Sequence, residues 1–130
     1  MYKLPTYDEF VNEIAGLFTS TDVIGNPIKI GNLEVAERDL TELNGADLKL
    51  VNANRLAKKM GKGWRLPTRD ELTEMYKNVN SLPNIKKNAF YMSSETFGSK
   101  FVWIQNFGTG KQEYFTSGGQ AYSVRLVKTI

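Results

Sequence analysis

Apolar residues recur at helical spacing in the first two thirds of the chain. Three runs have this pattern: Phe10, Ile14, Leu17 and Phe18; Ala53, Leu56, Ala57 and Met60; and Leu72, Met75, Tyr76 and Val79. Each run predicts an amphipathic helix with one buried face. Asn52 is the candidate N-cap of the second helix and Gly61 its C-terminal stop, while residues 81–83 end the third.

The hydrophobic period changes to two in segments that are typical of strands. Ile28–Ile30 and Leu33–Val35 alternate apolar and polar positions on either side of residues 31–32, which predicts a tight hairpin. Further along, residues 101–104 are apolar on both faces. We therefore expect a central strand there, covered on each side.

The last third of the chain is predicted to form a meander. Residues 108–110 connect the central strand to a returning strand over 111–116, and residues 121–127 form a closing strand. Helices that precede a run of strands predict an α+β fold with the helices packed on one antiparallel sheet. We divide the chain of 130 residues into an N-terminal helical extension, 1–27, and a domain, 28–130. The extension is either an added packing element or an interaction arm.

One stretch, residues 61–72, ends the second predicted helix and begins the third. Pro67 favours an extended conformation before it, Thr68 is the predicted N-cap, and Glu71 completes a capping box. Trp64 lies between the glycines and the proline, and we expect it to anchor the helices against the sheet. The predicted aromatic core consists of Trp64, Phe90, Phe101 and Trp103.

The composition excludes several kinds of chemistry. The chain has no Cys and no His, so it lacks a thiol nucleophile, a thiolate metal site and an imidazole base. The acidic pairs at residues 8–9 and 70–71 lie in predicted first helical turns, where capping and the helix dipole account for them. Residues 83–120 contain no Asp and no dense acidic cluster that would suit calcium. We expect no enzyme activity, no cofactor and no metal site.

Hydropathy bears on where the protein resides. No apolar run approaches the roughly 20 residues that span a bilayer, so we expect no membrane insertion. Asp8 and Glu9 precede any apolar segment, and a signal peptide is therefore not expected. These features favour a cytoplasmic protein, or one that is built into a particle in the cytoplasm.

The mildly basic charge leaves open a nucleic-acid partner. The formal net charge is +3 at pH 7. Basic residues gather near the junction of the second and third predicted helices: Lys58, Lys59, Lys62, Arg65 and Arg69, with Lys86 and Lys87 further on. Such a cluster could contact phosphates. A solvated helix end explains it as well, because lysines are favourable beside a helix C-terminus and no nucleic-acid motif accompanies them.

Three motifs resemble a known family. The run at 63–68, Gly-Trp-Arg-Leu-Pro-Thr, followed by Glu-Leu at 71–72, is similar to the signature of a bacterial and phage domain family of C-type-lectin-like fold. That family includes the C-terminal domain of the Legionella collagen-like adhesin and is related to formylglycine-generating enzymes. Residues 91–95, Tyr-Met-Ser-Ser-Glu, and 124–127, Val-Arg-Leu-Val, match further family motifs, with Met92 where the family has Trp. The resemblance covers about residues 28–130.

The resemblance implies a non-catalytic binding or assembly module, since the related enzymes work through cysteines that this chain lacks. Because the family occurs in phages, it suggests a virion component: a decoration protein, fibre tip or receptor-binding subunit. The implied partners are neighbouring proteins in an assembly, a second copy of the chain, or a cell-surface glycan or protein. A lectin-like adhesin domain is the alternative. The late strands form the implied contact surface, with Gln105, Asn106, Tyr114, Gln120 and Tyr122 as its candidate residues.

Overall fold

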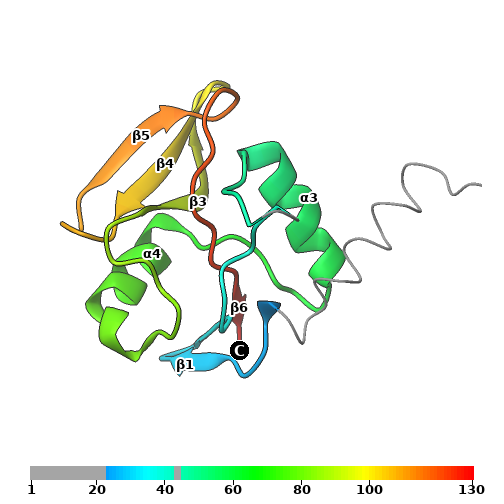
Figure 1. Ribbon diagram of the computed structural model, residues 1–130, viewed down its shortest axis with the longest axis vertical. Helices are drawn as coiled ribbons and strands as arrows, with labels where there is room; N and C mark the ends of the chain where they lie inside the picture. The colour runs from blue at the N-terminus through cyan, green and yellow to red at the C-terminus, as the bar shows by residue number, and fades with distance from the viewer. Residues whose placement is uncertain (1–22, 43–44) are drawn as a thin grey trace, which may run out of the picture.

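Two small antiparallel sheets, in place of the single sheet expected, carry the strands of this protein (Figure 1). The computed structural model describes residues 23–42 and 45–130. Within them lie, in chain order, β1 (Ile28–Ile30), β2 (Leu33–Val35), α3 (Leu50–Met60), α4 (Arg69–Lys77), the 3-10 helix η1 (Val79–Ser81), β3 (Phe90–Phe97), β4 (Phe101–Asn106), β5 (Gln112–Thr116) and β6 (Val127–Thr129). The architecture is α+β. The predicted helix around Phe10–Phe18 lies outside the described residues.

The first sheet is built on the predicted hairpin. β1 and β2 pair antiparallel with Ile30 opposite Leu33, and β6 adds to the other side of β2, giving the order β1-β2-β6. Gly31, between the two strands, has a φ of 56°, which glycine adopts without strain. The hairpin prediction is confirmed.

The second sheet has the order β3-β4-β5, so β4 is central, as predicted. We expected both faces of this strand to be buried, and only one is. Val102 and Ile104 are buried, but Phe101 and Trp103 on the opposite face are only half-buried. Because successive side chains point to opposite faces of a strand, one face of β4 meets the core while the other is covered at one end only, where α4 packs.

The predicted closing strand over 121–127 is mostly irregular. Tyr122 and Val124 form isolated bridges with Leu48 and Leu40, and Ser123 bridges Tyr91 on β3. A regular strand begins only at Val127, with β6. The segment passes from one sheet to the other, so its residues pair with several partners and no continuous ladder forms.

The junction between the helices forms as predicted. α3 ends at Gly61, whose φ of 64° suits a glycine, although its N-cap is Lys49 and Asn52 lies inside the helix. α4 has Thr68 as N-cap and a complete capping box with Glu71. Leu48 exchanges backbone hydrogen bonds with Tyr122 and therefore lies outside the helix. α3 begins directly after this pairing, ahead of Asn52.

The three sequence motifs meet in space. Arg65 and Val127 exchange backbone hydrogen bonds of 2.9 and 2.8 Å, and the N–H of Ser94 donates to the carbonyl of Pro67 at 2.7 Å. The N–H of Arg69, in the first turn of α4, donates to Oε2 of Glu95 at 2.6 Å. Residues distant in sequence therefore hold the start of α4 against both sheets.

The hydrophobic core lies between the sheets and helices. Trp64 is only 8% exposed and packs with residues of α3, β3 and β4, which confirms its predicted place. Phe90 is at the surface and Phe101 and Trp103 are half-buried, so these three predicted core aromatics were placed wrongly. Val23 and Ile24, before the expected boundary at residue 27, are buried in the same core. None of the helices in the described part of the chain has the length and apolarity that a membrane crossing requires.

Candidate functional site

The β4–β5 hairpin presents different residues on its two faces. Trp103 pairs with Tyr114, and Val102 pairs with Phe115 on the next rung of the ladder. Because side chains alternate along a strand, Tyr114 lies on the Trp103 face and Phe115 lies on the opposite face. Both β5 aromatics are about half exposed, at 46% and 48%. Strand β5 therefore has an exposed aromatic ring on each side of the sheet.

Four rings form a contiguous surface, which we call the aromatic platform: Phe97, Phe101, Trp103 and Tyr114. Phe97 stacks on Tyr114 with the ring centroids 4.6 Å apart and the planes 21° apart. Trp103 and Phe101 meet the Tyr114 ring edge-on, at 5.2 and 5.7 Å. These are favourable offset and edge-to-face geometries, so the rings support one another in a fixed arrangement.

A guanidinium group adjoins the aromatic platform. The Cζ of Arg69 lies 3.6 Å from the centre of the Trp103 ring, within the range of a cation–π interaction. Its Nε donates to Oε1 of Gln112 at 2.9 Å, which holds the guanidinium in this position. Arg69 is the first residue of α4, so the capping of that helix also positions the cation.

The opposite face of the same hairpin borders a groove of about 450 Å³. Its lining consists of Asp47, Ala89, Phe90, Ile104, Glu113, Phe115, Gln120, Ala121 and Tyr122. Tyr122 is 7% exposed, and its hydroxyl donates to the carbonyl of Thr116 at 3.0 Å. Burial raises the pKa of that hydroxyl, so it stays protonated as a donor. The groove has aromatic walls and a few polar groups at its rim.

The five predicted contact residues do not form one surface. Tyr114 belongs to the aromatic platform, whereas Gln120 and Tyr122 line the groove on the other face. Gln105 is 1% exposed and its amide binds Gly110 and Gln112, while Asn106 caps the turn by accepting from the N–H of Gly108. Amides and tyrosines in late strands suggested recognition. Gln105 does lie on the same face of β4 as Trp103, but α4 and Gln112 cover that end of the face and bury it.

Sequence reasoning missed Phe97 and Arg69 as parts of a surface. Phe97 is the last residue of β3 and is 51% exposed, and Phe101, only four residues later, starts β4. The short connection between Phe97 and Phe101 could have predicted a hairpin that places these two rings side by side. Nothing in the sequence places Arg69 beside Trp103, because that contact depends on how α4 lies on the sheet.

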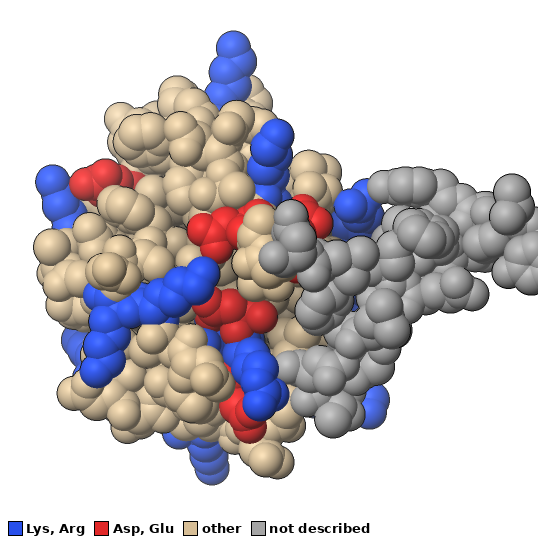
Figure 2. All heavy atoms as spheres, in the orientation of Figure 1, with Lys and Arg blue, Asp and Glu red and all other residues tan. Residues whose placement is uncertain are grey.

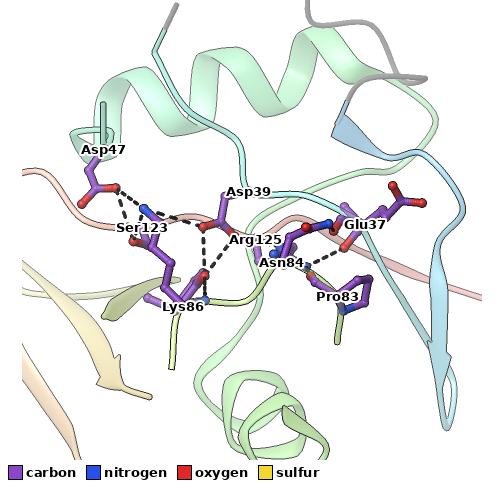
Figure 3. Close-up of polar contacts among 10 residues, drawn as sticks. Glu37, Asp39, Asp47, Pro83, Asn84, Lys86, Ser123 and Arg125 are labelled. Carbon is purple, nitrogen blue, oxygen red and sulfur yellow. Dashed lines mark hydrogen bonds and ion pairs between the residues drawn. The ribbon is translucent and has the colours of Figure 1, made fainter. Parts of the chain in front are cut away.

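A buried polar network joins the loop after β2, the loop after η1 and the segment before β6 (Figure 3). Arg125 is fully buried, and its Nε donates to Oδ1 of Asp39 at 2.8 Å. Its Nη1 donates to the carbonyls of Ala36 and Pro83, at 3.1 and 2.8 Å. The hydroxyl of Tyr91 donates to Asp39 at 2.9 Å. Arg125 thereby connects three segments that are far apart in sequence.

The network extends to the surface through one lysine. Nζ of Lys86 lies 3.9 Å from Asp39 and 3.3 Å from Asp47, which also accepts from Ser123 at 3.3 Å (Figure 3). Burial raises the pKa of Asp39, against the opposing effect of the Arg125 charge. Burial also raises the pKa of Tyr91, so this phenol stays protonated and donates. These polar groups bind one another, so the network serves to hold the loops and the C-terminal segment together.

Three of the basic residues near α3 and α4 have partners within the protein. Arg65 is paired with Glu71 at 2.7 Å, Arg69 stacks on Trp103, and Lys86 binds Asp47. Lys58 and Lys59 remain in the last turn of α3. Figure 2 shows Lys and Arg dispersed over the visible face with Asp and Glu between them.

Side chains that ligate metals do not cluster in the described part of the chain. Within residues 23–42 and 45–130, no group of three or more His, Cys, Asp or Glu side chains could hold a metal ion. The aromatic platform and the groove supply stacking surfaces, hydrogen-bond donors and acceptors, and one stacked cation. Comparison with family models and with curated proteins finds no match to this chain.

Proposed function

We propose that this protein is a non-catalytic binding module that recognises the surface of a partner protein through its aromatic platform. The observation that supports this proposal is the cluster of four contacting rings, two of them about half exposed, beside the Arg69 guanidinium. Tyr, Trp and Arg are the residues most enriched at energetic hot spots of protein interfaces. Exposed apolar clusters in a monomer mark interaction sites.

The preorganised rings favour this function on energetic grounds. Rigid aromatic side chains have few rotatable bonds, so little conformational entropy is lost when a partner covers them. Phe97 and Tyr114 are held by stacking, and Trp103 is held between Tyr114 and Arg69. A partner would therefore meet a surface that needs no rearrangement.

We also propose the C-type-lectin-like fold for residues 28–130 and, from the family resemblance, a place in a phage virion as a decoration, fibre or receptor-binding subunit. The close approach of the three family motifs, through Arg65–Val127 and Ser94–Pro67, supports this proposal, since motifs that define one framework are expected to touch. A cell-surface glycan is the second candidate ligand, because stacked tyrosine with nearby amides also suits sugar rings.

Binding selection with a matched pair of variants tests the function. A random peptide library and a glycan array would be applied to the immobilised wild-type protein, to Phe97→Ser and to Phe115→Ser. Phe97 and Phe115 are similarly exposed but lie on opposite faces of the sheet. We expect peptides whose binding falls at least about tenfold with Phe97→Ser and is kept with Phe115→Ser. If only glycans bind, the ligand of the aromatic platform is a glycan and the proposal of a protein partner is wrong. An absence of ligands in both arms, or equal loss in both variants, would refute a role for the aromatic platform.

A further inference from the structure

We propose that strand β5 pairs antiparallel with β5 of a second copy of this chain, joining two β3-β4-β5 sheets into one. This inference does not rest on what the aromatic platform binds, although the two surfaces share Tyr114. It rests on the hydrogen bonding of β5, on the protection of the other sheet edges, and on the self-complementarity of the β5 sequence.

The register of the β4–β5 ladder shows which backbone groups face outward. The N–H of Asn106 donates to Lys111 and the N–H of Ser117 donates to Lys100, both at 2.9 Å. In an antiparallel ladder, hydrogen-bonded pairs alternate with non-hydrogen-bonded pairs. Gln112, Tyr114 and Thr116 therefore direct their N–H and C=O groups away from β4, toward the open edge.

This edge is largely unoccupied in the described part of the chain. Tyr122 donates to the carbonyl of Thr116, and that is the one hydrogen bond that described residues make to the outward groups of β5. A carbonyl oxygen has a second lone pair, so Thr116 can still accept another bond. Figure 1 shows β5 as the outermost strand of its sheet, with no other labelled element beside it.

The other sheet edges are protected. β3 is bulged where it pairs with β4, and its outer edge is occupied by Ser123, which exchanges backbone hydrogen bonds with Phe90 and Met92, and by Pro67, which accepts from Ser94. β1 has only three residues and carries Lys29 at its centre, and β6 is bridged by Arg65. Charged residues, shortness and bulges are the usual means of preventing edge pairing. β5 also carries one charge, Glu113, but among the described strands it alone combines five residues in a regular, unbulged ladder with two exposed aromatic residues.

The sequence of β5 suits a second copy in antiparallel orientation. A register centred on Tyr114 places the two Tyr114 residues opposite each other and Gln112 opposite Thr116 of the second copy. Glu113 then faces Phe115, so no like charges meet. A parallel in-register pairing would instead place Glu113 against Glu113. Aromatic cross-strand pairs are favourable and like charges are unfavourable, which selects the antiparallel register.

The resulting assembly is closed. The order of the joined sheet is β3-β4-β5-β5-β4-β3, and both of its outer edges are β3 edges, occupied by Ser123 at Phe90–Met92. A two-fold axis through the Tyr114 pair makes the contact isologous, so association stops at a dimer. The exposed rings of Tyr114 and Phe115 would be partly covered at this contact.

Single-cysteine cross-linking tests the register, since the natural chain has no cysteine. In a hydrogen-bonded antiparallel pair the Cα atoms are about 5.5 Å apart, within the range that a disulfide bridges. Tyr114→Cys should therefore form a covalent dimer under mild oxidation. Phe115→Cys is the control, because Phe115 faces Glu113 of the second copy and lies away from its own counterpart. Equal or slower cross-linking of Tyr114→Cys would overturn the register.

Light scattering after size exclusion tests the association itself, up to about 300 µM, where a dimer with a Kd of micromolar order is populated. The wild type should be a dimer. Tyr114→Lys should weaken association at least about tenfold by placing two cations at the centre of the contact, whereas Phe115→Lys should preserve it, since that position faces Glu113. A wild type that stays monomeric would overturn the proposal and leave the aromatic platform's function untouched.

Discussion

The Nε of Arg125 donates a hydrogen bond of 2.8 Å to Oδ1 of Asp39, and both side chains are buried, Arg125 completely and Asp39 to all but 8%. The same guanidinium holds the carbonyls of Ala36 and Pro83, while its Nη2 has no hydrogen-bond partner among the described residues. One side chain from the Val-Arg-Leu-Val motif thus connects the loop after β2, the loop after η1 and the C-terminal segment. This makes Arg125 the first position at which stability should be tested.

Replacing Arg125 by Met should destabilise the protein by about 3–5 kcal/mol, because the buried Asp39 carboxyl would lose its hydrogen-bonded charged partner and keep only Lys86, 3.9 Å away. Urea denaturation gives the free energy of unfolding. Arg55→Met, at an exposed position of α3, is the control and should change it by no more than about 0.5 kcal/mol. Similar losses in the two variants would show that the Arg125–Asp39 pair contributes little.

Gly110→Ala should be destabilising by about 1–3 kcal/mol for two reasons. The φ of Gly110 is +82°, and an added Cβ would lie 2.6 Å from Cε2 of Tyr76. Gly118→Ala is the matched control, since nothing lies within 4 Å of its Cβ position. Thermal unfolding should show a lower Tm for Gly110→Ala than for Gly118→Ala. Equal Tm values would mean that Tyr76 moves aside at little cost.

Trp64→Ala should lower the free energy of unfolding by about 3–5 kcal/mol, because it leaves a large void in the core. Trp103→Ala should cost less, since Trp103 is only half-buried and packs on the outer face of the sheet. Chemical denaturation followed by circular dichroism compares the two variants without relying on tryptophan emission. A larger loss for Trp103→Ala would contradict the assignment of Trp64 as the anchor of the helix junction.

The Glu71 carboxylate should make stability depend on acidity. Its hydrogen bonds with the Arg65 guanidinium, and with Thr68, hold the pKa of Glu71 below its usual value of 4.5. A depressed pKa in the folded state means that the stabilisation is complete above about pH 4.5 and is lost as the pH falls through the folded-state value. The free-energy difference between wild type and Glu71→Gln should therefore shrink below about pH 4.5.

Denaturation midpoints measured from about pH 3 to pH 7 would follow this difference, which we expect to be about 1 kcal/mol at neutral pH because the pair is partly exposed. Repeating the comparison in an Arg65→Met background is the control. There the pH dependence should be weaker, because the largest cause of the pKa shift is gone. Parallel curves for wild type and Glu71→Gln would contradict the prediction.

Local elements were predictable because their determinants lie within a few residues of one another. The capping box of Thr68 and Glu71, the stop at Gly61 and the β1–β2 hairpin each depend on backbone groups one turn or one rung away. Asn52 was misassigned as a cap because α3 begins where Leu48 leaves its pairing with Tyr122. That pairing joins residues more than seventy positions apart, and no local rule predicts it.

The candidate site was only partly predictable for the same reason. The sequence pointed to late strands and to Tyr114, which does lie in the aromatic platform. It also pointed to Gln105, which lies on the same face of β4 as Trp103 but is buried because α4 packs over that end of the sheet. Phe101 and Trp103 looked like core residues because they are apolar, yet the extent of their burial depends on how much of the sheet a nine-residue helix covers.

By itself, then, the sequence determined the end of α3 at Gly61, the start of α4 at Thr68, the tight turns, the central strand and the burial of Trp64, since short-range sterics, capping and apolar spacing decide these features. Only the tertiary structure decided that the strands divide into two sheets, that Arg125 is buried against Asp39, and that β5 is left with an open edge. Those outcomes depend on contacts between segments far apart in the chain, and their energies exist only once the segments have packed together.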